Sequence, residues 1–180
     1  MSEPRDPIAV LRAKVKEAGW GVTIDETLDF AQPDLRTLLE VWRQKAAARG
    51  GLPTREDFDM RTLKPFLRHL SIVEKVPDDA GRPHFRFRLH GSLMAQHFGD
   101  QTGKFLENAI PPHLVDGWNL GYDAILEAGR PVRVLIHYGM ESVSYLTGET
   151  FCVPLGNGSA APVAVLTATY FTPRAMQKAS

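Results

Sequence analysis

The chain has 180 residues, in which 21 Lys and Arg residues balance 21 Asp and Glu residues. A net charge of zero argues against broad electrostatic binding of nucleic acid or of an anionic membrane surface. No apolar run approaches the ~20 residues that a membrane helix needs, and no leading apolar segment is typical of a secretory signal. We therefore expect a cytoplasmic protein that binds neither nucleic acid nor membrane, with a length that suits one domain with extensions.

Two amphipathic helices are predicted before residue 52. The first has apolar residues at helical spacing over residues 8–18 and stops at Gly19. The second follows Asp34, a candidate N-cap, and ends at Gly50-Gly51, because glycine suits the residue after a helix. Residues 20–32 between them show no firm period. The apolar face of the second helix consists of Leu35, Leu38, Leu39, Trp42 and Ala46.

A β-hairpin is predicted over residues 70–90. In its second strand Phe85, Phe87 and Leu89 alternate with Arg86, Arg88 and His90, and a period of two is typical of a strand with one buried face. The turn lies in the Pro- and Gly-containing run 77–83. The arginines either face outward, with Glu74 opposite one of them, or point into a pocket and favour an anionic ligand. The outward register is favoured, because burying an unpaired arginine is costly.

Helices and three further strands are expected after the hairpin. A short helix is expected at 92–98 and another short element or turn at 102–108, and a longer helix begins at Pro111-Pro112 and ends at Gly129. Gly117 and Gly121 lie one turn apart in it and indicate either close approach of another backbone or bound group, or a surface that tolerates glycine. The strands are predicted at 131–138, 143–155 and 162–171, with a turn at 156–159.

Several short motifs resemble those of the PAS family, most closely the small stand-alone PAS proteins of bacteria, largely alphaproteobacteria. The resemblance covers roughly residues 35–171 and implies a sensory or regulatory module rather than a defined reaction. Its motifs are Leu52-Pro53-Thr54-Arg55, Asp57-Phe58-Asp59, Leu67-Arg68-His69-Leu70, Phe85-Arg86-Phe87-Arg88-Leu89-His90-Gly91-Ser92 and Phe98-Gly99-Asp100-Gln101-Thr102-Gly103-Lys104.

The order of elements and the resemblance together predict an α+β fold. It would be a PAS-like five-stranded antiparallel sheet with helices on one face, plus an N-terminal helical extension. The expected parts are the extension at 1–51, the PAS-like sensory domain at 52–173 and a polar tail at 174–180.

No metal site or cofactor is predicted. None of the six histidines stands at HExxH spacing, and Cys152, the single cysteine, can form neither a zinc site with a second cysteine nor an internal disulfide. Haem ligation through His97 or His113 is disfavoured, since neither lies in a recognisable motif. A nucleophilic pair of Cys152 with His137 is conceivable, but a core cysteine is the favoured interpretation.

Two polar motifs have both a functional and a structural interpretation. The Gly156-x-Gly158-x-x-Ala161 pattern superficially matches a dinucleotide fingerprint, but a strand follows it, so a hairpin turn is favoured. The acidic and basic residues Arg55, Glu56, Asp57 and Asp59 could hold a ligand, whereas helix capping and surface ion pairs are favoured.

The leading hypothesis is a cytoplasmic PAS-type module that binds a small apolar molecule, a signalling protein, or both, and that is a homodimer without catalytic activity. The candidate dimer surface is Leu35, Leu38, Leu39 and Trp42, unless that helix caps its own sheet. The alternatives are a small isomerase- or dehydratase-like enzyme using Tyr122, Asp123, His137, Tyr138 and Glu141, and a structural adaptor with a filled core. The candidate pocket consists of Phe87, Leu89, Met94, Phe98, Trp118, Tyr122, Val134 and Tyr170.

Overall fold

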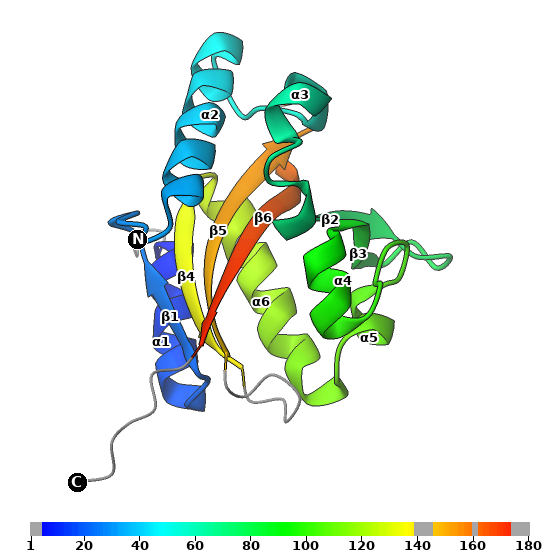
Figure 1. Ribbon diagram of the computed structural model, residues 1–180. Helices are drawn as coiled ribbons and strands as arrows, with labels where there is room; N and C mark the ends of the chain where they lie inside the picture. The colour runs from blue at the N-terminus through cyan, green and yellow to red at the C-terminus, as the bar shows by residue number, and fades with distance from the viewer. Residues whose placement is uncertain (1–4, 139–145, 160–161, 174–180) are drawn as a thin grey trace, which may run out of the picture.

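A six-stranded antiparallel sheet forms the centre of the molecule, with helices on both of its faces (Figure 1). The computed structural model describes residues 5–138, 146–159 and 162–173. The strands lie in the order β1-β4-β5-β6-β2-β3. Glu141, Ala161, the expected strand start at Val143 and the tail 174–180 lie outside the described residues. The α+β class and the antiparallel sheet are confirmed, while the number of strands and the coverage of the faces differ from the prediction.

The elements follow the predicted sequence of helices, hairpin, helices and strands, with one additional strand near the N-terminus. Two 3₁₀ turns, Arg55–Asp57 and Leu67–His69, flank the short helix α3. The helices are α1 (Pro7–Ala18), α2 (Pro33–Arg49), α3 (Met60–Leu63), α4 (Ser92–Phe98), α5 (Leu106–Ala109) and α6 (Pro112–Ala128). The strands are β1 (Val22–Asp25), β2 (Leu70–Pro77), β3 (Pro83–His90), β4 (Val132–His137), β5 (Leu146–Gly156) and β6 (Pro162–Pro173).

Glycine and proline set the helix ends as the sequence indicates. Pro112 occupies the first turn of α6, and Gly19, Gly50 and Gly129 end α1, α2 and α6 in the left-handed conformation. The predicted cap of α2 is wrong. Gln32 precedes the helix, and the Asp34 carboxylate instead accepts a hydrogen bond from the Tyr170 hydroxyl at 2.7 Å.

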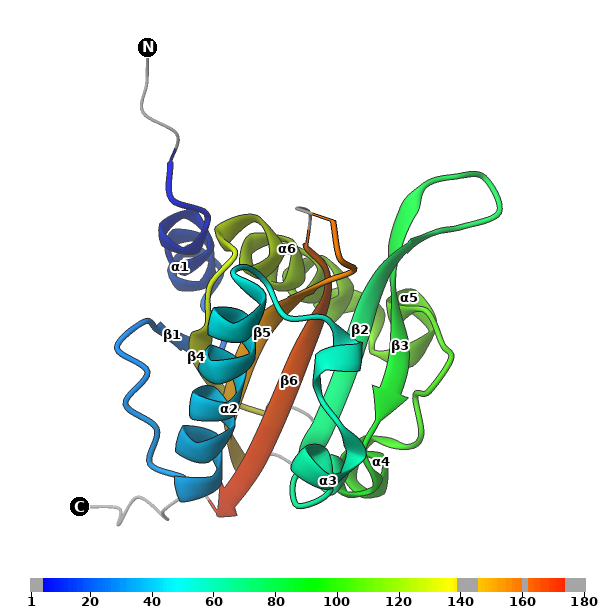
Figure 2. The same ribbon diagram turned by 90° about the horizontal axis from the view of Figure 1, so that it is seen from above.

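Two apolar cores lie on opposite faces of the sheet. The view from above shows α1 and α6 on one face and α2 on the other (Figure 2). Successive residues of β6 divide between them, because side chains alternate along a strand. Leu166 packs with α2 on one face, and Val165 packs with α1 and α6 on the other. Helices therefore cover both faces rather than one. The reason is that α2, expected as an extension, lies on the sheet and is fixed there by a hydrogen bond from the Trp42 indole to the Pro154 carbonyl at 3.3 Å.

The sixth strand, β1, lies in the segment for which the sequence showed no firm period. It pairs with β4, with Val22 opposite Ile136 and Asp25 opposite Arg133. Four residues are too short a stretch to give a reliable alternation, so pairing with β4 decides its conformation. The segment before residue 52 therefore shares the sheet and both cores with the rest of the chain.

A buried ion-pair network joins β1, β4, β5 and the start of α2. The Glu149 carboxylate is in a residue only 6% exposed. It accepts hydrogen bonds from the backbone N–H groups of Ala31 at 2.8 Å and Gln32 at 2.9 Å, and from Arg133 Nε at 2.7 Å. Arg133 reaches on to Asp25 at 3.0 Å. These bonds hold the chain that enters α2 against the sheet.

We predict that Glu149→Gln lowers the free energy of unfolding by about 3 kcal/mol, because Arg133 loses its closer carboxylate in a site that water hardly reaches. Equilibrium urea unfolding measures this change. The matched control is Glu56→Gln, an exposed acid, with an expected change within about 0.5 kcal/mol. Equal stabilities of the two variants would contradict the structural role of Glu149.

Candidate ligand site and contact surfaces

Four of the eight predicted pocket residues lie together on the face of the sheet that α6 covers. Phe87 and Tyr122 are buried in this core, and Trp118 and Val134 pack against it partly buried. The Tyr122 ring lies 5.6 Å from that of Trp118, and also contacts Phe85 at 5.2 Å. Burial raises the pKa of Tyr122 well above its usual range. Aromatic side chains thus fill the space between α6 and the sheet.

The other four predicted pocket residues lie elsewhere. Leu89 and Tyr170 pack against the core on the α2 face, and Phe98 belongs to an aromatic cluster with Tyr138 at the end of the sheet. Met94 is buried in α4. The eight residues therefore do not line one cavity. None of them lines either of two surface hollows, of which one lies between α1 and β1 and the other between α1 and α6.

A β-bulge in β3 explains why Leu89 faces away from Phe87. Phe87 pairs with Val73, but Leu89 pairs with Ile72, so Arg88 is one residue in excess. An extra residue reverses the alternation beyond it. Leu89 consequently turns to the α2 face, and the residue after it turns back to the α6 face.

His90 is the residue that this reversal places on the α6 face. Its Nδ1 lies 3.1 Å from the Ser71 hydroxyl, and its ring meets the Phe87 ring edge-on at 5.2 Å. Its Nε2 is the one buried side-chain nitrogen or oxygen within the described ranges that has no hydrogen-bond partner. Burial lowers the pKa of His90 below the ordinary value of 6.5. A neutral imidazole with one free nitrogen can donate to or accept from a polar atom that enters this space.

The segment after α4 lies close to this histidine in the fold. Gln101 is only 7% exposed, and its amide donates to the Phe98 carbonyl at 2.6 Å. The Phe87 N–H donates to the Lys104 carbonyl at 2.9 Å, and Gly103 returns a bond to the Phe87 carbonyl at 2.7 Å. These backbone bonds cover the free edge of β3. Sequence patterns did not single out Ser71, because a lone polar residue carries no period, and Gln101 appeared only within the motif at residues 98–104.

The predicted dimer surface on α2 is turned to the inside of the molecule. Leu35 and Leu38 are fully buried, and Leu39 and Trp42 are 5% and 8% exposed. The helix thus caps its own sheet, which was the alternative use of that face. A dimer through these four side chains would require α2 to leave the sheet.

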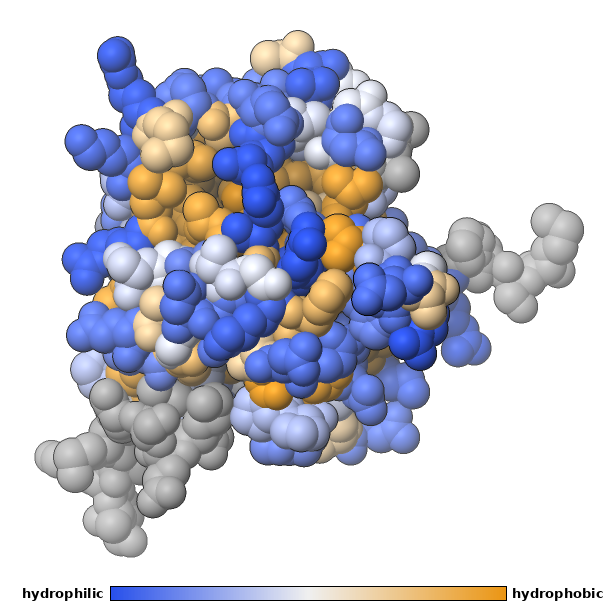
Figure 3. Space-filling model, turned by 90° about the vertical axis from the view of Figure 1, so that its right-hand side faces the viewer, coloured by the Kyte–Doolittle hydropathy of each residue, from blue (hydrophilic) through white to orange (hydrophobic). Residues whose placement is uncertain are grey.

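The two arginines of β3 point outward, as favoured from the sequence. Arg86 lies 3.5 Å and Arg88 3.7 Å from the Glu74 carboxylate, and their side chains are 41% and 52% exposed. Figure 3 shows the face on which this hairpin lies, where hydrophilic side chains stand beside a gathering of apolar ones. The arginines therefore do not line an anion pocket in the core.

The cluster at residues 55–59 serves as caps. Asp57 accepts hydrogen bonds from Arg49 at 2.6 Å and from the Thr54 N–H at 2.7 Å. The Arg49 guanidinium, together with this N–H, holds the pKa of Asp57 well below its usual range. Asp59 caps α3 by accepting a bond from the Thr62 N–H at 2.7 Å.

The Cys152–His137 pair considered for nucleophilic catalysis is not brought together. Cys152 is opposite Val132 and His137 is opposite Thr147 in the pairing of β4 with β5, so the two lie several residues apart. Burial raises the pKa of Cys152 to about 12. Asp123 forms an ion pair with Lys75 at 2.5 Å on the surface. Within residues 5–138, 146–159 and 162–173 there is no group of His, Cys, Asp or Glu able to hold a metal ion and no helix able to cross a membrane.

Comparisons with known proteins give weak likeness to solved structures. No protein-family model and no curated protein matches the chain. Among solved structures, the chain is similar to an RNA-binding light-oxygen-voltage receptor, with a TM-score of 0.37 and 16% identity over 66% of this chain. The match spans only 35% of that receptor's chain. A likeness of this size carries no weight for ligand, partner or activity.

The two glycines of α6 differ in their surroundings. A Cβ on Gly117 would come within 3.2 Å of the Trp20 ring, whereas one on Gly121 would meet no described atom within 4 Å. Gly117 thus makes room for the Trp20 side chain, whereas the sequence suggested another backbone or a bound group as the neighbour. Gly121 lies against open space.

We predict that Gly121→Ala raises the free energy of unfolding by about 0.5–1 kcal/mol, because alanine restricts the unfolded chain and fits the helix. Gly117→Ala is the matched comparison and should lower stability, since Trp20 must shift. Urea unfolding of both variants measures the difference. A destabilised Gly121→Ala protein would contradict the open surroundings of that residue.

We predict that acid weakens the fold partly through His90. Because its folded-state pKa is lowered, its contribution to stability is complete above pH 6.5 and is lost as the pH falls below this value. The drop in Tm between pH 7 and pH 5 should be smaller in His90→Asn than in the wild type. His113→Asn, at an exposed position, should keep the full drop. Identical drops in all three proteins would show that His90 is not buried in its neutral form.

Proposed function

We propose that this chain is a PAS-type sensory or regulatory module. The order of two strands, helices and three strands supports it, since this is the arrangement that the resemblance implies. The position of α6 across one face of the sheet, with aromatic side chains beneath it, adds to this support. The proposed role is binding and relay rather than catalysis.

The proposed ligand is a small, largely apolar molecule with one polar atom, held beside His90. The observation that carries this proposal is the buried Nε2 without a partner. A buried polar atom left unpaired is costly, roughly 1–3 kcal/mol, so a ligand that pairs with it gains this energy. Phe87 and Met94 supply the apolar surroundings.

Entry of such a ligand requires movement, because the interior is filled. The proposed moving element is α4, which is short and directly follows His90. Its N-terminal end is tightly held, since a Cβ on Gly91 would come within 2.5 Å of the Leu67 carbonyl. Its C-terminal end is followed by Gly99, whose φ of 76° lies in the left-handed region. A hinge at Gly99 is consistent with this asymmetry.

The proposed output is contact with another protein in the cytoplasm, either a signalling partner or a second copy of the chain. Ligand binding that favours one position of α4 would change the surface offered to that protein. We propose no nucleic-acid or membrane partner, in keeping with the zero net charge.

The test is native mass spectrometry of gently purified protein, with an absorbance scan of the same sample. We expect a co-purifying mass in the wild type and in His97→Asn, the control on α4. In His90→Asn the bound fraction should correspond to roughly tenfold weaker binding, because the polar anchor is lost. Thermal melting monitored by circular dichroism checks that the variants are folded.

A clean apoprotein mass for the wild type, with no absorbance beyond the aromatic band, would contradict the ligand proposal and favour a structural adaptor. Equal loss of the bound mass in both variants would show that His90 is not the anchor.

A further inference from the structure

Strand β1 leaves one edge of the sheet open. Gly21 accepts a hydrogen bond from the His137 N–H, so Gly21, Thr23 and Asp25 direct their backbone groups toward β4. Val22 and Ile24 therefore direct theirs away from the sheet. An exposed strand edge is a template for pairing with another strand.

The outward backbone groups are partly used within the chain. The Val22 N–H donates to the Trp20 carbonyl at 2.7 Å, and the Ile24 carbonyl accepts from Arg12 Nε at a long 3.4 Å. Among the described residues, no hydrogen bond is recorded for the Ile24 N–H or for the Val22 carbonyl. One donor and one acceptor, two residues apart, thus remain for a neighbouring strand.

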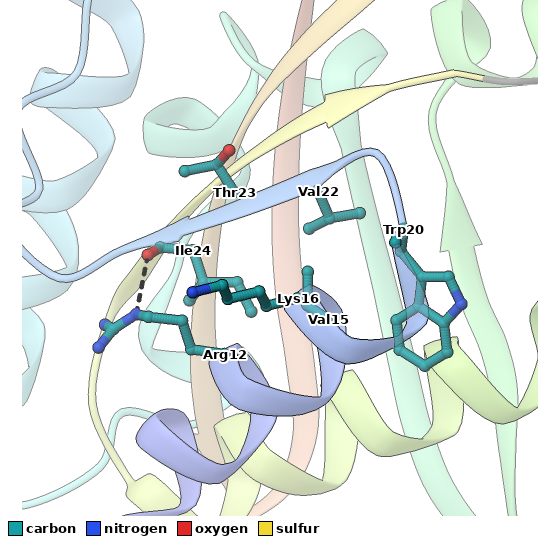
Figure 4. A pocket seen from close by; sticks show the side chains of 8 residues that line it. Arg12, Val15, Lys16, Trp20, Val22, Thr23 and Ile24 are labelled. Atoms are coloured by element: carbon teal, nitrogen blue, oxygen red, sulfur yellow. Dashed lines mark hydrogen bonds between the residues drawn. The ribbon is translucent and has the colours of Figure 1, made fainter.

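A hollow of about 310 Å³ runs between this edge and α1. Figure 4 shows that Arg12 and Lys16 extend from α1 toward β1, while the Trp20 ring turns away from them. The Arg12 side chain is bound to Glu26 at 2.6 Å, and Lys16 has no ion-pair partner among the described residues. The hollow therefore offers a basic side chain next to apolar surface and free backbone groups, which suits an extended segment that carries an acidic residue.

The β1 segment itself has these properties. It is extended, carries Val22 and Ile24 on one side, and is followed directly by Glu26, on the same side as α1. We propose that two copies of this chain pair edge to edge through β1, antiparallel and centred on Thr23.

The two-fold symmetry makes the contacts self-complementary. Val22 lies opposite Ile24 of the second copy, so each Ile24 N–H donates to the Val22 carbonyl of the other copy. Glu26 of the second copy lies opposite Trp20, near Lys16, which would join Arg12 and Arg130, the two partners that this carboxylate already has at 2.6 Å each. This charge contact occurs twice. The two sheets become one continuous sheet. This surface does not depend on the proposed sensory role, and it replaces α2, whose apolar side chains are buried in the fold.

A disulfide cross-link at the two-fold axis tests the geometry. Thr23 is exposed and would face its own counterpart as a non-hydrogen-bonded pair, with the Cα atoms about 4.5 Å apart, which suits a disulfide. Burial raises the pKa of Cys152 to about 12, so the native thiol contributes little background. We expect Thr23→Cys to form a covalent dimer on mild oxidation, while Ala80→Cys, exposed at the hairpin tip, does not.

Sedimentation equilibrium tests the charge contact without oxidation. We expect the wild type to sediment at twice the 20.0 kDa of the chain, and Lys16→Glu to dissociate with a Kd at least about tenfold higher. Lys14→Glu carries the same charge change at an exposed position of α1 that does not line the hollow, and should match the wild type.

Each other outcome overturns the proposal. A wild type that stays monomeric at high concentration contradicts pairing altogether. A wild-type dimer that Lys16→Glu leaves intact, and that Thr23→Cys fails to trap, places the contact on another surface. None of these outcomes bears on whether a ligand binds beside His90.

Discussion

The buried carboxylate of Glu149 is the constraint on which the arrangement of the N-terminal third depends. It receives two backbone N–H groups from the chain entering α2 and the guanidinium of Arg133. A charged group this far from water is tolerated only when its hydrogen bonds are satisfied. Because these donors come from different segments, β1, β4, β5 and α2 are fixed relative to one another. With α2 held in this way, one apolar core closes on each face of the sheet.

The parts of the fold that the sequence predicted are those governed by local chemistry. Gly19, Gly50 and Gly129 end helices because the left-handed conformation suits glycine, and Pro112 begins one because its ring fixes φ. The hairpin turn and the pairing of Glu74 with Arg86 follow from residues close together in the chain. Such features require no knowledge of distant contacts, so a single sequence contains enough information.

The parts that could not be predicted depend on contacts between distant segments. The same apolar stripe on α2 would suit a dimer or its own sheet, and the Trp42 bond to Pro154 decides between them. The strand β1 exists because β4 is available beside it. The predicted pocket put Phe87 and Leu89 on one face of the sheet because an unbroken alternation was expected, and the bulge at Arg88 interrupts it. Without knowledge of that bulge, the sequence could not predict which face of the sheet His90 occupies.

That single extra residue in β3 decides from which face of the sheet the following segment leaves. If Arg88 took a regular place in the strand instead of being in excess, a strict two-residue repeat would rotate everything beyond it by half a turn about the strand axis. The imidazole now beside Ser71 would then face α2, and α4 would begin on the opposite side of the sheet. Deleting Arg88 would remove the excess residue and leave Leu89 and His90 on the faces they now occupy, opposite Ile72 and Ser71.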